Sequence, residues 1–361
     1  PHQGRQGSEG AVLSHVSKRI VVCCDGTWNR PDQRDEGKLS PTNVVKVKRA
    51  VAQSGPGDIR QLVYYDRGVG TRWLEHLRGG AFGYGLSENI RQAYRYLVNH
   101  YEPGDDVFFF GFSRGAYTAR STAGFIRKCG LLKREHNGRI QEAYAFYRRR
   151  DEASHPQGEE ATTYRRLYSR EIRIKFIGVW DTVGTLGIPF GFLSKIFNRK
   201  LEFHDVKLSS YVDNAFQALA IDERPRFFAP AIWEQQAHAV GQAFGQAWFA
   251  GVHSNIGGGY ADPGLSDISL LWILGKAAAC GLALKDDYVP SNVHPNPAGE
   301  LRDSKTGFYR LIPDFRRPIG AVKDGAELVH RSAVERMKSG GASYRPQSLV
   351  EYLNSGGRVI D

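Results

Sequence analysis

Residues 108–115 read FFFGFSRG, an apolar run that leads into a Gly-x-Ser-x-Gly motif, and helix-compatible residues follow at 116–119. This motif supplies a nucleophile when the serine lies at a sharp turn between a buried strand and a helix. Side chains at Gly111 and Gly115 would collide with the neighbouring strand and helix if Ser113 is to stand exposed above the sheet. The segment therefore predicts Ser113 as a nucleophile. The alternative is a glycine-rich turn in which Ser113 caps the helix.

The composition is that of a globular protein with a sizeable core. The chain has 361 residues, of which 41% are hydrophobic, which is ample for one large domain with insertions or for two smaller domains. No apolar run is long enough to span a bilayer. Residues 1–17 are polar and glycine-rich, and we predict that they are disordered.

Cysteine usage indicates a reducing compartment. The four cysteines stand at positions 23, 24, 129 and 280. Cys23 and Cys24 are adjacent in an apolar segment, so in a strand their side chains would point to opposite faces. This favours buried, reduced thiols and a cytoplasmic location. No cysteine spacing typical of a metal site is present, and we predict neither a metal nor a cofactor.

The formal net charge is +11, but the basic residues are scattered, and we expect no nucleic-acid partner. The densest cluster comprises the arginines at 148–150 with Arg165 and Arg166 nearby. It falls in a polar segment, 133–170, that we predict to be a helical insertion. A solvated helix face is the simpler interpretation, and attraction to an anionic membrane surface is the alternative.

Apolar segments alternate with helical patterns along most of the chain. Because the apolar segments are not clearly two-sided, they predict a mostly parallel α/β sheet with helices on both faces. We expect a catalytic domain over 18–284 and a C-terminal extension over 285–361 that packs on it. Besides the run before Ser113, the predicted strands are 18–24, 61–65, 172–180 and 247–252, and the predicted helices include 43–53, 86–101, 209–219 and 267–280.

Reactive residues follow three of the predicted strands. Ser113, Asp181 and His253 occur in the chain order of an α/β-hydrolase triad, so we predict an α/β-hydrolase-like fold. His253 would accept the proton of Ser113 and return it to the leaving group, and Asp181 would orient the imidazole. The open alternatives are His204 and His238 for the base, Asp262 and Asp267 for the acid, and a turn-capping role for Asp181.

An oxyanion hole would need two backbone N–H groups. One belongs to the residue after the nucleophile, Arg114, and the other to the loop after an earlier strand, where Gly26 and Thr27 are the candidates. Asp25 precedes them in the same loop. We favour hydrogen bonds within the loop over metal binding for Asp25, because no clustered His or carboxylate partners are evident in the sequence.

Five motifs, taken in order, resemble one family. They are CDGTWN at 24–29, YDRGVGT at 65–71, GFSRGAY at 111–117, VWDTVG at 179–184 and HSNIGGGY at 253–260. The family consists of α/β-hydrolase-like domains of bacteria and fungi, long of unknown function, and includes phospholipase effectors of type VI secretion. The resemblance covers roughly residues 18–280, including the segment at 220–224. It implies a Ser-Asp-His esterase with Ser113, Asp181 and His253 in these roles, and export by a secretion system.

We therefore expect a serine hydrolase that cleaves carboxylic esters, with a lipid or phospholipid acyl ester as the substrate. Two other classes of function remain open. A binding module on the same scaffold would use no nucleophile. A metal- or phosphate-dependent hydrolase would use Asp25, Asp66 and Asp181. The oligomeric state is not indicated by the sequence.

Overall fold

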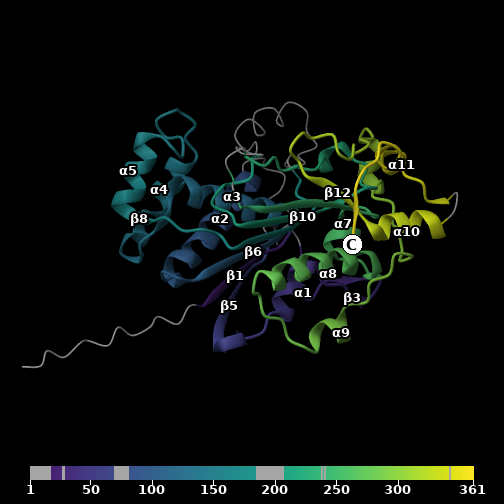
Figure 1. Ribbon diagram of the computed structural model, residues 1–361, viewed down its shortest axis with the longest axis horizontal. Coiled ribbons are helices and arrows are strands. Elements are labelled where there is room, and N and C mark those ends of the chain that lie inside the picture. Colours follow the sequence, from purple (N-terminus) through teal and green to yellow (C-terminus); the bar gives the residue numbers. More distant parts are fainter. Residues whose placement is uncertain are drawn as a thin grey trace, which may run out of the picture.

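A mostly parallel sheet forms the centre of the protein (Figure 1). The structure is a computed structural model that describes residues 18–26, 29–68, 81–183, 207–236, 239, 241–340 and 343–361. Within these residues the main sheet has nine strands in the order β13-β12-β11-β10-β9-β6-β1-β5-β4, and all neighbours run parallel except β4 and β5. The strands are β1 (Arg19–Cys24), β4 (Ser54–Gly55), β5 (Ile59–Asp66), β6 (Asp106–Phe112), β9 (Phe176–Trp180), β10 (Asn214–Ala220), β11 (Ala243–Phe249), β12 (Glu327–His330) and β13 (Val359–Ile360).

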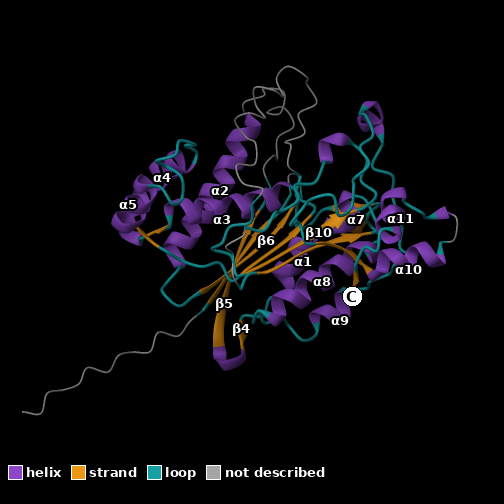
Figure 2. Cartoon of the chain, turned by 45° about the horizontal axis from the view of Figure 1, so that its top comes forward, coloured by secondary structure: helices purple, strands orange, loops and turns teal. Residues whose placement is uncertain are grey.

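Helices cover both faces of this sheet (Figure 2). In β1, Ile20 and Val22 point into one hydrophobic core, and Val21 and Cys23 point into another, because side chains alternate along a strand. The predicted α/β-hydrolase-like fold is confirmed. The first core is covered by α2 (Ala81–His100), α3 (Arg114–Cys129) and α4 (Ile140–Tyr147), and the second by α1 (Asn43–Ala50) and α8 (Gly264–Ala279).

The segment 133–170 forms a helical layer beside α3, drawn in teal at the left of Figure 1. Of its basic side chains, that of Arg165 is buried, whereas Arg149 forms exposed ion pairs with Asp151 and Glu160. These pairs agree with the interpretation of a solvated helix face. The elements here are the 3-10 helix Arg134–Arg139, α4, α5 (Glu159–Tyr168) and the flanking antiparallel strands β7 (Leu131–Leu132) and β8 (Ser169–Arg170).

The C-terminal residues 285–361 pack on the same sheet. β12 extends the sheet beside β11, and β13 extends it beside β12. A third hydrophobic core joins Trp248 of β11 to Val329 of β12 and to Leu349. The other elements of this segment are α9 (Tyr288–Asn292), the 3-10 helix Gly307–Leu311, α10 (Arg331–Ser339) and α11 (Gln347–Asn354).

One helix prediction, at 209–219, is wrong. Residues Asn214–Ala220 form β10, which lies between β9 and β11 in the sheet. Ala215 packs into the first core and Ala218 into the second, so small side chains suit a strand that is covered on both faces. Tertiary packing here outweighs the local helix propensity of an alanine-containing segment.

All four cysteines are free, and Cys23, Cys24 and Cys129 are buried. As predicted, Cys23 and Cys24 point to opposite faces of β1. Burial raises the pKa of each of the three buried thiols, which keeps them protonated and unreactive.

Some predictions concern residues outside the described ranges. They are the disordered segment at 1–17, the oxyanion candidate Thr27, and the alternative bases His204 and His238. Among the helices that the structure does describe, none is long and apolar enough to cross a membrane.

Candidate active site

Polar residues follow several strands at the same edge of the sheet. Asp25 follows β1, Ser113 follows β6, Asp181 follows β9, and His253 begins α7 (His253–Gly257) shortly after β11. These strands are neighbours or lie one strand apart. Ligands of open α/β sheets bind beyond the carboxyl ends of parallel strands. The fold therefore brings four residues that are far apart in the chain to the edge where a site is expected.

Ser113 lies on a strained turn between β6 and α3. Its backbone angles, φ 57° and ψ −118°, belong to a region that residues other than glycine rarely adopt. The N–H of Ser113 donates to the carbonyl of Trp180 at 3.1 Å, which ties the turn to the end of β9. Such strain is typical of residues at functional sites.

The two glycines of the motif are required by close packing around this turn. A Cβ atom at Gly111 would lie 2.6 Å from the Cα of Ala116 in α3. A Cβ atom at Gly115 would lie 2.0 Å from the carbonyl oxygen of Cys24 in β1. The predicted collisions with the helix and with the neighbouring strand are confirmed.

The loop after β1 lies against the serine turn. A Cβ atom at Gly26 would be 3.4 Å from the Cβ of Ser113. The N–H of Gly26, however, donates to Oδ1 of Asp25 at 2.8 Å, so this oxyanion candidate is engaged within its own loop. The other candidate, Arg114, is the first residue of α3, and backbone N–H groups in the first turn of a helix stabilise negative charge.

Asp25 is buried, and neutral groups bind its carboxylate. The hydroxyls of Tyr65 and Thr42 donate to Oδ2 at 2.7 and 2.8 Å. The amide of Asn29 donates to Oδ1 at 3.3 Å, beside the N–H of Gly26. Burial raises the pKa of Asp25, and these hydrogen bonds oppose the shift only in part. The bonds from Gly26 and Asn29 lie within the loop, as predicted, and those from Thr42 and Tyr65 tie the loop to α1 and β5.

A second buried acid, Asp66, lies beside Asp25. The backbone N–H of Asp25 donates to the carbonyl oxygen of Asp66 at 3.1 Å, since β1 and β5 are paired. Burial, and after it the charge of Asp25, raises the pKa of Asp66 to about 7. No group of three or more His, Cys, Asp or Glu side chains in the described part of the chain is arranged to hold a metal ion.

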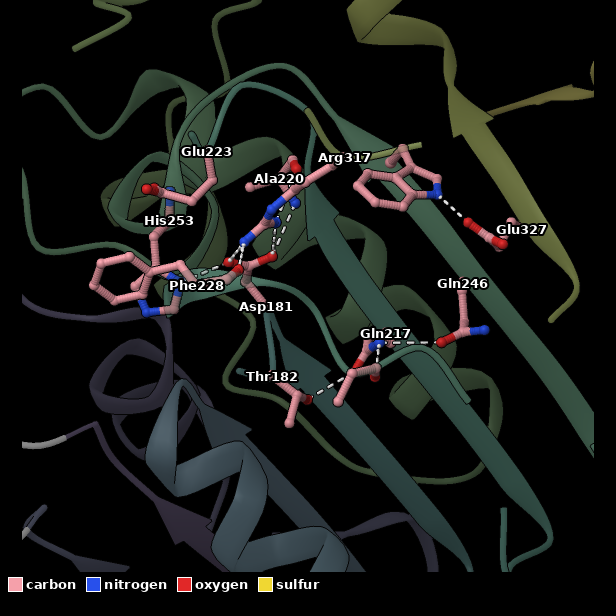
Figure 3. A network of polar contacts seen from close by, with 12 residues as sticks. Asp181, Thr182, Gln217, Ala220, Glu223, Phe228, Gln246, His253, Arg317 and Glu327 are labelled. Atoms are coloured by element: carbon pink, nitrogen blue, oxygen red, sulfur yellow. Dashed lines mark hydrogen bonds and ion pairs between the residues drawn. The ribbon is translucent and has the colours of Figure 1, made fainter. Parts of the chain in front are cut away.

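Asp181 and His253 form a hydrogen-bonded pair (Figure 3). Nδ1 of His253 lies 2.6 Å from Oδ2 of Asp181. Asp181 is 0% exposed, and its Oδ1 accepts the backbone N–H of Ala220 at 3.1 Å. A buried carboxylate in this position fixes the orientation of the imidazole ring.

Arg317 binds the other side of this carboxylate (Figure 3). Its Nη1 lies 2.5 Å from Oδ1 of Asp181 and its Nη2 lies 3.0 Å from Oδ2. The same guanidinium donates to the carbonyls of Ala220 and Phe228. Burial alone would raise the pKa of Asp181, but the charge of Arg317 and the hydrogen bonds from His253 and Arg317 outweigh it and hold this pKa well below its usual value. Asp181 is therefore ionised at neutral pH.

His253 is held through its backbone as well as through its ring. Its N–H donates to Oε2 of Glu223 at 2.8 Å. The rings of Phe112 and Phe228 lie against the imidazole, with centroid distances of 4.6 and 5.3 Å. Because Phe112 directly precedes Ser113, the imidazole lies next to the serine turn. The structure describes both residues, and the hydroxyl of Ser113 forms no direct hydrogen bond with His253. Hydrogen bonds of this kind often tighten only when the substrate binds.

The two alternative acids have other partners. Asp267 is paired with Lys46, whose Nζ lies 2.5 Å from Oδ1. Asp262 accepts the backbone N–H groups of Gly264 and Glu300, at 2.8 and 2.9 Å. The acid that is hydrogen-bonded to His253 is therefore Asp181.

Two residues of this site have no counterpart among the sequence predictions. Glu223 lies in the segment 220–224, which resembles the family, but nothing in the sequence indicates that it binds the backbone of His253. Arg317 lies in a polar, proline-containing stretch without periodicity. No local signal singles it out from its neighbour Arg316.

A comparison with protein families identifies the family of this chain. The family model "T6SS, Phospholipase effector Tle1-like, catalytic domain" matches residues 18–276. The chain belongs to this family. The predicted resemblance to phospholipase effectors of type VI secretion is thereby confirmed, and membership of the Tle1-like family supports a lipid-hydrolase function.

This Tle1-like domain spans only part of the length of the proteins that it resembles. An uncharacterized protein of Saccharomyces cerevisiae is 28% identical over 235 residues, which are 58% of this chain and 32% of that protein. The crystal structure of an uncharacterized protein from Pseudomonas aeruginosa has a TM-score of 0.45 and 19% identity, over 78% of this chain and 49% of that one. The structure of the Tle1 effector bound to the VgrG spike has a TM-score of 0.39 and 21% identity, over 69% and 52%.

Proposed function

We propose that this Tle1-like domain is a serine hydrolase that cleaves the acyl esters of phospholipids or related lipids. The proposal rests on the 2.6 Å hydrogen bond between His253 and Asp181, at the sheet edge that also carries Ser113. An ionised carboxylate bound to Nδ1 favours the tautomer in which Nε2 is free to accept a proton. A base of this kind is what a serine hydroxyl needs in order to act as a nucleophile at neutral pH.

In this proposal the ester is cleaved in two acyl transfers. Oγ of Ser113 attacks the ester carbonyl carbon while its proton passes to Nε2 of His253. The imidazolium then gives this proton to the leaving alcohol as the C–O bond breaks, and an acyl-enzyme remains. Water attacks the acyl-enzyme with His253 as the base again, and the fatty acid leaves as Ser113 regains its proton. Asp181 stays ionised throughout and stabilises the imidazolium.

Two backbone N–H groups would bind the oxyanion of each tetrahedral intermediate. Arg114 supplies the first, since it follows Ser113 at the start of α3. The loop after β1 supplies the second, because it lies against Ser113. The N–H of Gly26 donates to Asp25, which braces the loop, and the other candidate of this loop, Thr27, lies outside the described residues.

The surroundings of the site suit a lipid substrate. Phe228 is only partly buried and lies beside His253, and an aromatic ring in this position can contact an acyl chain, whereas Phe112 on the other side of the imidazole belongs to the core. The net charge of +11 favours approach to an anionic lipid surface. The link of the family to type VI secretion supports export as part of the same proposal.

Labelling with a fluorescent fluorophosphonate tests the nucleophile. The wild-type protein should be labelled and Ser113→Ala should not, because the reagent reacts with activated serine hydroxyls. The matched control is Ser121→Ala. Ser121 is a buried serine of α3, the helix that follows Ser113, and this variant should be labelled like the wild type. Release of fatty acid from phosphatidylglycerol vesicles should fall by at least about 10³-fold in Ser113→Ala alone.

Other outcomes would favour the other classes of function. Equal labelling of the wild type and Ser113→Ala would show that Ser113 is not the nucleophile. Vesicle binding without labelling or hydrolysis, by a folded wild-type protein, would favour a binding module. Hydrolysis that survives in Ser113→Ala but is lost on adding a chelator would favour a metal-dependent hydrolase built on Asp25 and its neighbours.

A further inference from the structure

Arg317 connects the catalytic edge of the sheet to the C-terminal segment. It lies beyond residues 18–276, which the family model matches, and before β12. Its side chain is 0% exposed, yet its guanidinium reaches both oxygens of Asp181 (Figure 3). A residue from outside the matched region thus contacts the proposed catalytic acid directly.

The guanidinium is buried with most of its donors in use. Nη1 donates to Asp181 and to the carbonyl of Ala220, and Nη2 donates to Asp181 and to the carbonyl of Phe228. In the described part of the chain, Nε has no partner. A buried ion pair adds little stability compared with well-packed apolar side chains, so stability alone is a weak reason for this arrangement.

The contacts with Arg317 fix the plane of the carboxylate. Two parallel N–H···O bonds form a fork that allows one orientation of Asp181. In that orientation Oδ1 also accepts the N–H of Ala220, and Oδ2 faces Nδ1 of His253. Rotation of the carboxylate would break several of these bonds at once, so the direction of the imidazole depends on Arg317.

The charge of Arg317 also changes the electrostatics at His253. A lone buried carboxylate next to an imidazole strongly favours the protonated ring, whereas a carboxylate that is neutralised by a guanidinium favours it less. Substitution of Arg317 leaves the other titratable groups around the ring in place. Among the described residues these groups include Asp222, which accepts the N–H of Gly251, Glu223, which accepts the N–H of His253, and Tyr260, which lies near Glu223.

We propose that Arg317 is a positioning residue of this active site, an inference that rests on the proposed triad. Its fork holds Asp181 in the plane that aligns His253. Its charge balances that of Asp181, so that the buried carboxylate does not act on the imidazole as a lone anion. The C-terminal segment then contributes a positioning residue to the site.

Two substitutions separate the geometry of Arg317 from its charge. Arg317→Lys keeps the charge and loses the fork. Its kcat for p-nitrophenyl butyrate should fall about 10- to 100-fold, with KM changed less than about threefold and the acid limb of the kcat/KM profile unmoved. Arg317→Gln also loses the charge, so its acid limb should move up by about one pH unit.

The matched control is Arg165→Lys in α5. Arg165 is also buried and also binds one carboxylate, that of Glu171, and two backbone carbonyls, but it lies in the helical layer away from the site. This variant should keep both the kcat and the acid limb of the wild type. A general effect of exchanging a buried arginine for lysine would appear equally at positions 165 and 317.

The outcomes separate this inference from the proposed function. Wild-type kcat in Arg317→Lys, or an unmoved acid limb in folded Arg317→Gln, would overturn the role of Arg317 while labelling of Ser113 still supports the hydrolase. If Arg317→Gln does not fold, Arg317→Lys decides through the fall in kcat at unchanged KM. A wild-type protein that neither hydrolyses the ester nor is labelled would overturn the proposed function and this inference together.

Discussion

Two buried aspartates at nearby strand ends have pKa values that are shifted in opposite directions. Asp25 follows β1 and Asp181 follows β9, on either side of β6. Burial raises the pKa of Asp25, whose carboxylate is bound by neutral donors. Burial acts on Asp181 in the same direction, but Arg317 and His253 outweigh it and hold that pKa well below its usual value.

The difference comes from the charge of the partners, because both side chains are buried to a similar degree. Neutral hydrogen bonds offset only part of the desolvation of the Asp25 carboxylate, whereas the charge of Arg317 and the hydrogen bonds from His253 and Arg317 together outweigh that of Asp181. A carboxylate that stays ionised can stabilise an imidazolium as it forms. We therefore assign Asp181 to the chemistry of the proposed hydrolase and Asp25 to the shape of the loop beside Ser113.

The largest effect is expected from Asp181→Asn. Its kcat should fall about 10⁴-fold with KM within a few-fold of wild type, because an amide cannot stabilise the imidazolium and favours the wrong tautomer of His253. The rate of ester hydrolysis measures the fall in kcat. Circular dichroism checks that the variant folds, because Arg317 loses its anionic partner in Asp181→Asn. The control Asp262→Asn, nearer to His253 in the sequence, should retain wild-type kcat. A loss of less than tenfold in folded Asp181→Asn would contradict the assignment.

A smaller effect is expected from Asp25→Ala. The substitution leaves the buried donors of Thr42, Tyr65 and Gly26 without their acceptor, so the free energy of unfolding should fall by about 2–4 kcal/mol. Asp25→Asn keeps an acceptor oxygen and should lose about half as much. Urea unfolding gives these values. The kcat of Asp25→Asn should fall no more than about tenfold, and a fall as large as that of Asp181→Asn would place Asp25 in the chemistry.

The smallest effect concerns Asp66, whose pKa burial raises to about 7. In the unfolded chain its pKa is about 3.9, so between these values the folded state binds more protons and stability falls as pH rises. Asp66→Asn should reduce the difference between the unfolding free energies at about pH 5 and about pH 8 by about 1–3 kcal/mol. Part of this difference should remain in Asp66→Asn, because burial also raises the pKa of Asp222, to about 6. An unchanged difference would show that Asp66 titrates normally.

The serine turn and the other strand ends are predictable from the sequence because their causes are local. Strands of a parallel sheet are buried on both faces, so they appear as apolar runs, and polar residues such as Asp181 mark where the runs end. Gly111 and Gly115 are also local signals, since their neighbours Ala116 and Cys24 leave no room for a Cβ atom.

Other features escape prediction for equally physical reasons. The segment 209–219 contains helix-favouring residues, but β10 is fixed by its place between β9 and β11. The N–H of Gly26 is a plausible oxyanion donor in the sequence, and only the loop geometry turns it to Asp25. The sequence leaves three acids open for His253, and the hydrogen bond of Asp181 decides among them.

The sequence by itself determined the class of sheet, the strained position of Ser113 and the family, because spacing and motif order act over short stretches of chain. The tertiary structure alone decided which acid meets His253 and which cation meets that acid. Arg317 and Asp181 stand 136 positions apart. A contact between such distant residues depends on how the C-terminal segment packs against the sheet, and it leaves no periodic or local pattern in the chain.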